Sequence, residues 1–289
     1  MDNLCELFGK TRQAYYKRDK YNYKEVAKED ILLQAIDKER ELMPKLGGRK
    51  LLLRLEKYFP KDILPGRDTF FDFLRNNGLL VGRRRRRIRT TYSNHWRRKY
   101  PNLIKDKTAT SINQIWVSDI TYIETSSGFV FLNLITDAYS RAIVGWDVGE
   151  TLRTVHTLKA LSMALKRLPK STEGLIHHSD RGSQYCSSQY VKKLTNRSIS
   201  ISMTESGDPR ENAIAERVNG ILKSEWLNQM KFKTIDDVNT ELKRVINIYN
   251  NIRPHSSLDM MTPAEASKKT GEINKCWNTY YKKRLEPSS

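Results

Sequence analysis

The sequence predicts an α/β core, a sheet with helices on its faces, preceded by an all-helical region. Short apolar segments typical of strands begin at about residue 110, and two long amphipathic helical segments close this part of the chain. Three adjacent strands, followed by helices that alternate with strands, are the order of an α/β sheet. With 289 residues, the chain is long enough for such a core and a smaller domain beside it.

The first 80 residues carry helical patterns joined by turn residues. Gly9 separates a short helical segment from a second one, for which Thr11 is the expected cap. Another pair of helices is predicted over 47–59 and 67–80, with Gly78 at the end of the second helix. We expect helix-turn-helix elements that bind DNA, although ordinary helical hairpins have the same pattern.

A strongly basic linker is predicted over 81–109. The chain has a net charge of +19, and its first 100 residues hold 26 Lys and Arg against 13 Asp and Glu. Arginines this close together repel one another on a helix, and no apolar period runs through them. We expect an extended arm along DNA phosphates, with a solvated linker or a localisation signal as the alternatives. The predicted DNA-binding arginines are Arg83, Arg84, Arg85, Arg86, Arg87, Arg89, Arg97 and Arg98.

The predicted core covers 110–268, and a basic tail over 269–289 ends the chain. Its strand segments are short and apolar, whereas its helical segments repeat apolar residues every three or four positions. The strands are predicted over 114–124, 128–138, 142–149, 174–180 and 198–203, and the helices over 154–168, 187–197, 209–227 and 235–252.

Two aspartates of the core stand where chemistry is expected. Asp119 lies inside the first strand, where a carboxylate lowers stability unless it is paired or binds a cation. Asp180 ends a strand, and ligands of open α/β sheets gather at the carboxyl ends of strands. Each has a structural alternative, which is an ion pair with an arginine for Asp119 and an Asx-turn or helix cap for Asp180.

Three further acids stand close together at the start of a predicted helix. Asp208, Pro209 and Glu211 have the order of a capping box with proline at the first helical position, which explains both acids structurally. Glu216 points about 140° away from Glu211 around the helix. A solvated glutamate is the structural alternative for Glu216, which belongs to a polar stripe of Asn212, Glu216, Asn219 and Lys223.

Asp119, Asp180 and Glu216 come from two strands and one helix and together could hold two divalent cations. Magnesium and manganese prefer oxygen ligands and keep several waters, so few protein ligands are needed. A pair of such ions activates the attacking oxygen and stabilises the leaving oxygen in phosphoryl transfer. We expect a site with two Mg²⁺ or Mn²⁺ ions that cuts or joins phosphodiesters of nucleic acid.

Five ordered segments resemble the DDE transposases of bacterial insertion sequences, the type with a retroviral-integrase-like core that is the product of a second, downstream reading frame. Asp180 and Glu216 are separated by 35 residues, the spacing that gives the DD(35)E group its name. Unlike the wider integrase group, the chain has no His/Cys zinc module before the core. The segments span about 110–265 and are WVSDITYIET, LITDAYSRAIVGW, HHSDRGSQY, NAIAERVNGILKSE and YNNIRPHSSLDMMTP.

The resemblance implies an RNase H-like core, with a mixed five-stranded sheet and helices on both faces. It implies that Asp119, Asp180 and Glu216 are the catalytic, metal-binding triad, and that Asp137 is structural. Lys223, seven residues after the glutamate, matches a basic residue that is expected to contact DNA. Supporting roles are expected for His178, Asn212, Arg253 and His255.

The implied function is transposition, in which DNA is cleaved at terminal inverted repeats and the freed 3′-hydroxyl is transferred into another phosphodiester. The expected partners are double-stranded DNA, as ends and as target, and further copies of the chain, with an upstream-frame protein as an open question. Three separated cysteines and no apolar run of spanning length favour a cytoplasmic protein without a membrane partner. Another RNase H-like nuclease or integrase of a mobile element, or a non-catalytic DNA-binding regulator, are the alternatives.

Overall fold

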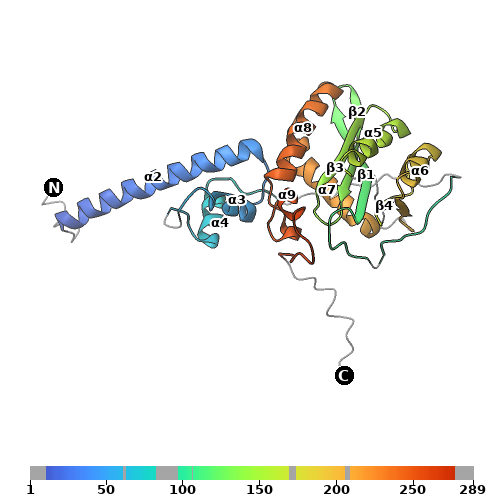
Figure 1. Ribbon diagram of the computed structural model, residues 1–289. Helices are drawn as coiled ribbons and strands as arrows, with labels where there is room; N and C mark the ends of the chain where they lie inside the picture. The colour runs from blue at the N-terminus through green and yellow to red at the C-terminus, as the bar shows by residue number, and fades with distance from the viewer. Residues whose placement is uncertain are drawn as a thin grey trace. The chain divides into compact units, whose positions relative to one another are not determined.

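The chain forms two compact units, Met1–Arg83 and Arg84–Ser289. This division comes from a computed structural model, which is drawn in Figure 1. The predicted bounds of the basic linker and of the C-terminal tail remain predictions. The residues described by the structure are 11–60, 63–82, 97–105, 107–168, 174–205 and 209–276.

The first unit is helical, as predicted, but its first described helix is much longer than a hairpin arm. α2 (Arg12–Leu42) continues without a break for 31 residues, and it is followed by α3 (Gly48–Leu55) and α4 (Arg67–Asn76). The predicted turn at Gly9 lies outside the described residues. The buried apolar side chains of the unit include Leu32, Ile36, Met43, Leu46, Leu51, Leu55, Phe70 and Leu74.

The predicted end of α4 at Gly78 is confirmed. Gly78 has a φ of 68°, a left-handed conformation that costs glycine little because it has no Cβ. The Leu79 N–H donates to the Leu74 carbonyl at 2.7 Å, and the Gly78 N–H donates to the Arg75 carbonyl at 3.1 Å. These two bonds are the Schellman arrangement, which satisfies carbonyls at the end of a helix.

The second unit contains the predicted five-stranded mixed sheet. The strands are β1 (Ile115–Thr125), β2 (Gly128–Asp137), β3 (Ile143–Gly149), β4 (Ile176–Ser179) and β5 (Ser200–Met203). Their order in the sheet is β3-β2-β1-β4-β5. The first three strands pair antiparallel, whereas β4 runs parallel to both β1 and β5.

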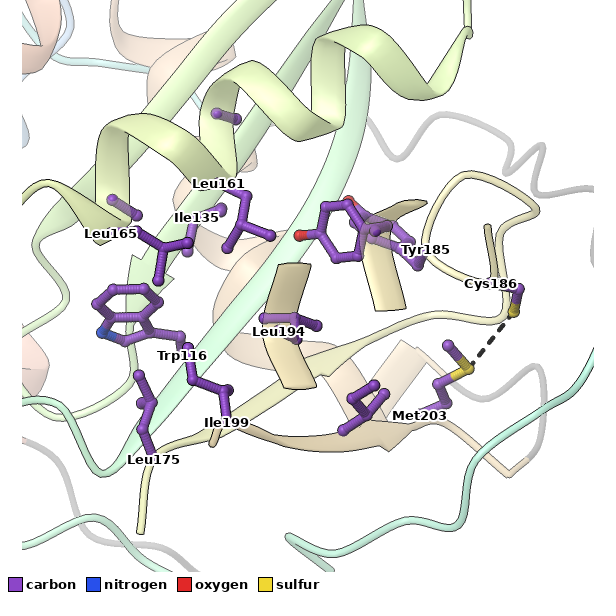
Figure 2. Packing of buried hydrophobic residues seen from close by; sticks show 14 residues of the cluster. Trp116, Ile135, Leu161, Leu165, Leu175, Tyr185, Cys186, Leu194, Ile199 and Met203 are labelled. Carbon is purple, nitrogen blue, oxygen red and sulfur yellow. Dashed lines mark hydrogen bonds between the residues drawn. The ribbon is translucent and has the colours of Figure 1, made fainter. Parts of the chain in front are cut away.

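Helices cover both faces of this sheet, as predicted for an RNase H-like core. On one face, α5 (Thr154–Leu165) and α6 (Ser188–Thr195) pack over a cluster that contains Trp116 of β1 (Figure 2). The opposite face carries α7 (Ala213–Glu225), whose Ala215 packs with Ile115 and Val117 of β1. Alternate residues of β1 therefore serve two separate cores, which is the two-residue period of a strand.

The remaining elements are helices and short turns around this core. α8 (Ile235–Asn251) contacts β3, and the short α9 (Pro263–Ala266) packs on α8. The 3-10 turns are η1 (Pro209–Asn212), η2 (Leu227–Gln229) and η3 (Ser256–Leu258). The described helices include none that is long and apolar enough to cross a membrane.

Asp137, at the end of β2, has the structural role predicted for it. One carboxylate oxygen accepts the backbone N–H and the hydroxyl of Ser140, both at 2.8 Å. The other oxygen accepts the Asn113 N–H at 2.8 Å. The carboxylate thus stabilises the turn between β2 and β3, together with the loop that enters β1.

Candidate active site

The sheet places the two predicted aspartates on neighbouring strands. Asp119 lies in the middle of β1, and Asp180 follows the last residue of β4 directly. Because Ser118 of β1 pairs with Ser179 of β4 in parallel register, the next residue of each chain is an aspartate. Two residues that are 61 positions apart in the sequence are therefore brought to the same level of the sheet.

The polar stripe of α7 runs along β1. The Asn212 side-chain amide donates to the Ser118 carbonyl at 2.9 Å, and the Asn219 amide donates to the Asp119 carboxylate at 2.8 Å. Further along the helix, the Lys223 ammonium donates to the Thr121 hydroxyl at 3.2 Å. Three members of the predicted stripe thus contact β1 in the order of the strand, at Ser118, Asp119 and Thr121.

Glu216 belongs to this stripe and stands between Asn212 and Asn219. Residues three and four positions apart share one face of an α-helix, so Glu216 lies on the same face as Asn212 and Asn219. Its charge acts on Asp119, where it favours the protonated acid. Glu216 is half-buried.

The electrostatics of the site centre on Asp119. The pKa of this carboxyl is raised from 3.8 to about 7, mainly by burial and also by the charges of Asp180 and Glu216, while the Asn219 hydrogen bond opposes the shift. Desolvation and like charges both disfavour an ionised carboxylate. No three His, Cys, Asp or Glu side chains among the described residues are grouped closely enough to hold a metal ion. The structure therefore couples the three acids electrostatically without gathering them around one point.

Two adjacent histidines of β4 form hydrogen bonds with residues around the acids. His177 contacts the Ser118 hydroxyl at 2.7 Å and the Tyr190 hydroxyl at 3.0 Å, on the face covered by α6. His178 points to the other face, where its Nε2 lies 3.1 Å from the Glu211 carbonyl. Burial lowers the pKa of His177 to about 3 and that of His178 to about 4, so both rings are neutral at pH 7.

His178 fixes the turn that leads into α7. Because a carbonyl only accepts, Nε2 carries the proton that is donated to Glu211. Nδ1 then accepts from the Ser202 hydroxyl at 2.8 Å, and Ser202 in turn accepts the Leu103 N–H at 2.9 Å. This chain of bonds joins β4, β5 and η1, and η1 is the turn that positions the first residues of α7.

The sequence matches the integrase core domain over most of this unit. One family model of the integrase core domain matches residues 109–209, and a second matches residues 197–263. The uncharacterized 31 kDa protein of insertion element IS600 from Shigella sonnei is 34% identical over 90% of this chain and 96% of its own length. A putative transposase for insertion sequence element IS986/IS6110 from Mycobacterium tuberculosis is 30% identical over 84% of this chain and 85% of its own. The chain belongs to the insertion-sequence transposases.

Other similar proteins cover smaller shares of this transposase. The transposase for insertion sequence element IS629 from Shigella sonnei is 34% identical over 66% of this chain and 64% of its own. Among solved structures, a chain of the simian T-cell lymphotropic virus intasome is 16% identical over 79% of this chain and 74% of its own, with a TM-score of 0.49.

The predicted start of α7 in this transposase is wrong. The α-helix begins at Ala213, after the 3-10 turn η1, and not at Pro209. The Glu211 carboxylate accepts the Glu205 N–H at 2.6 Å, so it stabilises the entry to η1. Asp208, the predicted cap, lies outside the described residues.

The predicted supporting residues near the C-terminus brace the fold. Arg253 is 1% exposed and forms two hydrogen bonds with the Glu225 carboxylate, at 2.6 and 2.7 Å. This pair joins the end of α7 to the loop after α8. The His255 ring accepts the Ser257 N–H at 3.3 Å and thereby caps η3.

The structure describes only two of the arginines predicted to bind DNA. Arg97 donates to the Ser183 carbonyl, in the loop after Asp180, at 2.9 Å. The Arg98 guanidinium lies 5.3 Å from the centre of the Tyr100 ring. The six predicted arginines between 83 and 89 lie outside the described residues.

Sequence reasoning missed the residues that act through tertiary contacts. It included Asn219 in the polar stripe without assigning the hydrogen bond to Asp119, and it gave no role to Ser202, His177 or Tyr190. The doubled histidine before Asp180 was the available signal, because consecutive strand residues face opposite sides of a sheet. The partners on either side depend on helices that are distant in the sequence.

Proposed function

We propose that this transposase cuts DNA at the terminal inverted repeats of its insertion sequence and joins the freed 3′-hydroxyl to another phosphodiester. Asp119, Asp180 and Glu216 are the residues that perform this polynucleotidyl transfer. The observation that carries the proposal is the raised pKa of Asp119, to which both of the other acids contribute. Buried like charges are typical of catalytic centres, where a cation or proton balances them.

Although the three carboxylates are not gathered around one point in the structure, their chemistry suits divalent metal ions. Three carboxylates are the oxygen ligands that Mg²⁺ and Mn²⁺ prefer. In the described part of the chain, Asp119 has an amide donor and no ion pair with a lysine or arginine. The buried Oδ1 of Asn219 makes no hydrogen bond with the described residues, and it can accept from a water of a hydrated ion. We therefore assign two ions, Mg²⁺ or Mn²⁺, to Asp119, Asp180 and Glu216.

When bound, such ions activate the attacking oxygen and neutralise charge on the leaving oxygen. The protein itself orients the acids. Asn219 holds one Asp119 oxygen, while His178 and Asn212 fix the two sides of the turn that starts α7. Because water and then the 3′-hydroxyl are the nucleophiles, no serine or tyrosine is assigned to a covalent intermediate.

Double-stranded DNA is the proposed partner. The net charge of +19 favours a polyanion, and the arginines from Arg83 to Arg98 together with Lys223 are proposed to contact phosphates. The Lys223 ammonium lies 3.8 Å from the centre of the Tyr122 ring and donates to the Thr121 hydroxyl, two residues after Asp119 in β1. Two ends must be brought together for transposition, so we propose that copies of the chain assemble on DNA. The predicted upstream-frame partner has no support from the relatives or the fold.

The test is cleavage of end-labelled DNA that carries the ends of the encoding element, in the presence of Mg²⁺. Asp180→Asn and Glu216→Gln should bind this DNA but fail to cut it, because each loses a metal ligand. Glu211→Gln is the matched control, since the Glu211 carboxylate accepts the Glu205 backbone N–H at the entry to η1, and this variant should keep cutting. Cleavage by both of the first two variants at the wild-type rate would refute the triad. A wild type that binds without cutting would instead indicate a regulator.

A further inference from the structure

A groove runs beside the first turns of α7, on the flank of the helix next to Glu216. It consists of two adjoining hollows, of about 520 and about 450 Å³. Both hollows are lined by Arg141, Ile214, Ser257 and Lys275, so they form one elongated depression. None of these residues belongs to the carboxylate site.

The groove is basic along its whole length. Arg217 lines the first hollow and Lys107 the second, while Arg141 and Lys275 line both. Glu272 is the only acid among the described lining residues. Arg217 is exposed, and its guanidinium makes no hydrogen bond or ion pair with the described residues. Its charge is therefore available to a ligand.

The floor of the groove holds a guanidinium that no carboxylate neutralises directly. Arg141 donates to the Ser257 hydroxyl at 3.4 Å and to the Ala138 carbonyl, both of which are uncharged. Asp137 is the acid whose charge stabilises it, but the oxygens of that carboxylate are taken by Ser140 and by the Asn113 backbone. Burying a cation without a paired anion is costly, and a bound anion removes that cost.

A second polar group at the floor also lacks a partner. Tyr139 is 5% exposed and lines the second hollow, and its hydroxyl makes no hydrogen bond with the described residues. A buried hydroxyl is normally paired, so each exception needs an explanation. A phosphate oxygen would accept from this hydroxyl and from the guanidinium of Arg141.

We propose that this groove binds the backbone of DNA through its phosphates, on the strand that passes from the carboxylate site across the first turn of α7. The proposal rests on the function proposed above, because it assumes a strand held at Glu216. Glu216 and Arg217 are adjacent and about 100° apart around the helix, so a strand that leaves one reaches the other. Basic residues spread over two joined hollows suit successive phosphates better than a single small anion.

The test is the salt dependence of DNA binding, measured without metal so that cleavage plays no part. Arg217→Gln should reduce the slope of log K against log salt concentration by about one, as expected for one lost phosphate contact. Arg167→Gln removes the same charge from an exposed position outside the groove and should leave the slope unchanged. An unchanged slope for Arg217→Gln would overturn the proposal even if the carboxylate variants fail to cut. A reduced slope, together with carboxylate variants that cut normally, would support the phosphate contact of the groove and refute only the proposed triad.

Tyr139→Phe tests the floor of the groove without removing a buried charge. Because the hydroxyl has no partner among the described residues, this variant should unfold at the same denaturant concentration as wild type and yet bind DNA more weakly. Equal DNA affinity would place the phosphate elsewhere and contradict the proposal. Inorganic phosphate is the further probe. If it raises the melting temperature of wild type but not of Arg217→Gln, while both have the same DNA slope, the ligand is a small anion and the DNA assignment is wrong.

Discussion

Replacing Asp119 with asparagine should stabilise the metal-free protein at alkaline pH while it abolishes cleavage. The pKa of Asp119 is raised from 3.8 to about 7. Between these two values the folded protein holds a proton that the unfolded chain has lost, so the stability of the wild type falls as the pH rises. Each unit of pKa shift corresponds to about 1.4 kcal/mol, which gives a cost of up to about 4 kcal/mol above pH 7.

Asparagine at this position carries no charge and can still accept the amide proton of Asn219. At pH 5 the ionisation cost of the wild type is only about 1.5 kcal/mol, since the pH is about one unit above the unfolded value. The stability advantage of Asp119→Asn should therefore grow by about 2.5 kcal/mol from pH 5 to pH 8.

The assay is urea denaturation in EDTA at both pH values, followed by tryptophan fluorescence. All five tryptophans lie in the second unit, so the signal reports the unit that contains the catalytic core. Magnesium should narrow the gap at pH 8, because it binds the ionised wild-type site. An advantage that is equal at both pH values, or a variant less stable than wild type at pH 8, would refute the reasoning.

Three other substitutions test the supports of the site and of the fold. His178→Phe leaves the Glu211 carbonyl and the Ser202 hydroxyl without their His178 partner. It should lower the free energy of unfolding by about 1–3 kcal/mol and slow cleavage. Unchanged cleavage would contradict the positioning role of His178. Arg253→Met leaves the Glu225 carboxylate partly buried and without its Arg253 partner, which should lower the free energy of unfolding by about 3–5 kcal/mol in denaturant titrations. Adding Glu225→Leu should recover most of this loss of stability. Losses that add up in the double variant would contradict the pairing. Gly145→Ala would place a Cβ in steric clash with the Ala160 carbonyl of α5, so it should lower the free energy of unfolding by about 1–3 kcal/mol. A melting temperature equal to wild type would show that α5 packs elsewhere.

The fold of the core is predictable because each strand alternates between two buried environments. In β1, Ile115 and Val117 face α7 while Trp116 faces α5 and α6. The same alternation places Asp119 among apolar neighbours, and that conflict is the signal of a functional acid. Distinguishing it from Asp137, another acid in a strand, depended on the resemblance to insertion-sequence transposases, because the bonds of Asp137 to Ser140 are visible only in the structure.

The local sequence pattern gave a wrong prediction for the start of α7, where residues distant in the sequence bind the same atoms. The order of Asp208, Pro209 and Glu211 predicts a capped α-helix, but Glu211 is held through its carbonyl by His178 and through its carboxylate by Glu205. Those contacts favour a 3-10 turn, which delays the α-helix to Ala213. A capping pattern contains only interactions between residues close in the sequence, so it could not predict the later start of the α-helix.

The length of α2 could not be predicted from the sequence pattern either. Its apolar residues are few and are not gathered on a single face along the whole helix, so the usual amphipathic period is weak. Among the described side chains of α2, the buried ones are Leu32, Ile36 and Glu39, near its C-terminal end. Packing of that end fixes the helix, and the charged remainder continues it because Lys, Arg and Glu are good helix formers.

The most direct test of the three-carboxylate site is anomalous X-ray diffraction from crystals of the transposase soaked in Mn²⁺. We expect anomalous peaks coordinated by Asp119, Asp180 and Glu216, with water completing the coordination of each ion, and no such peaks in crystals of Asp119→Asn. Manganese bound instead through Glu211 or Asp137, in a protein that cuts its DNA with Mn²⁺, would refute the three-carboxylate site.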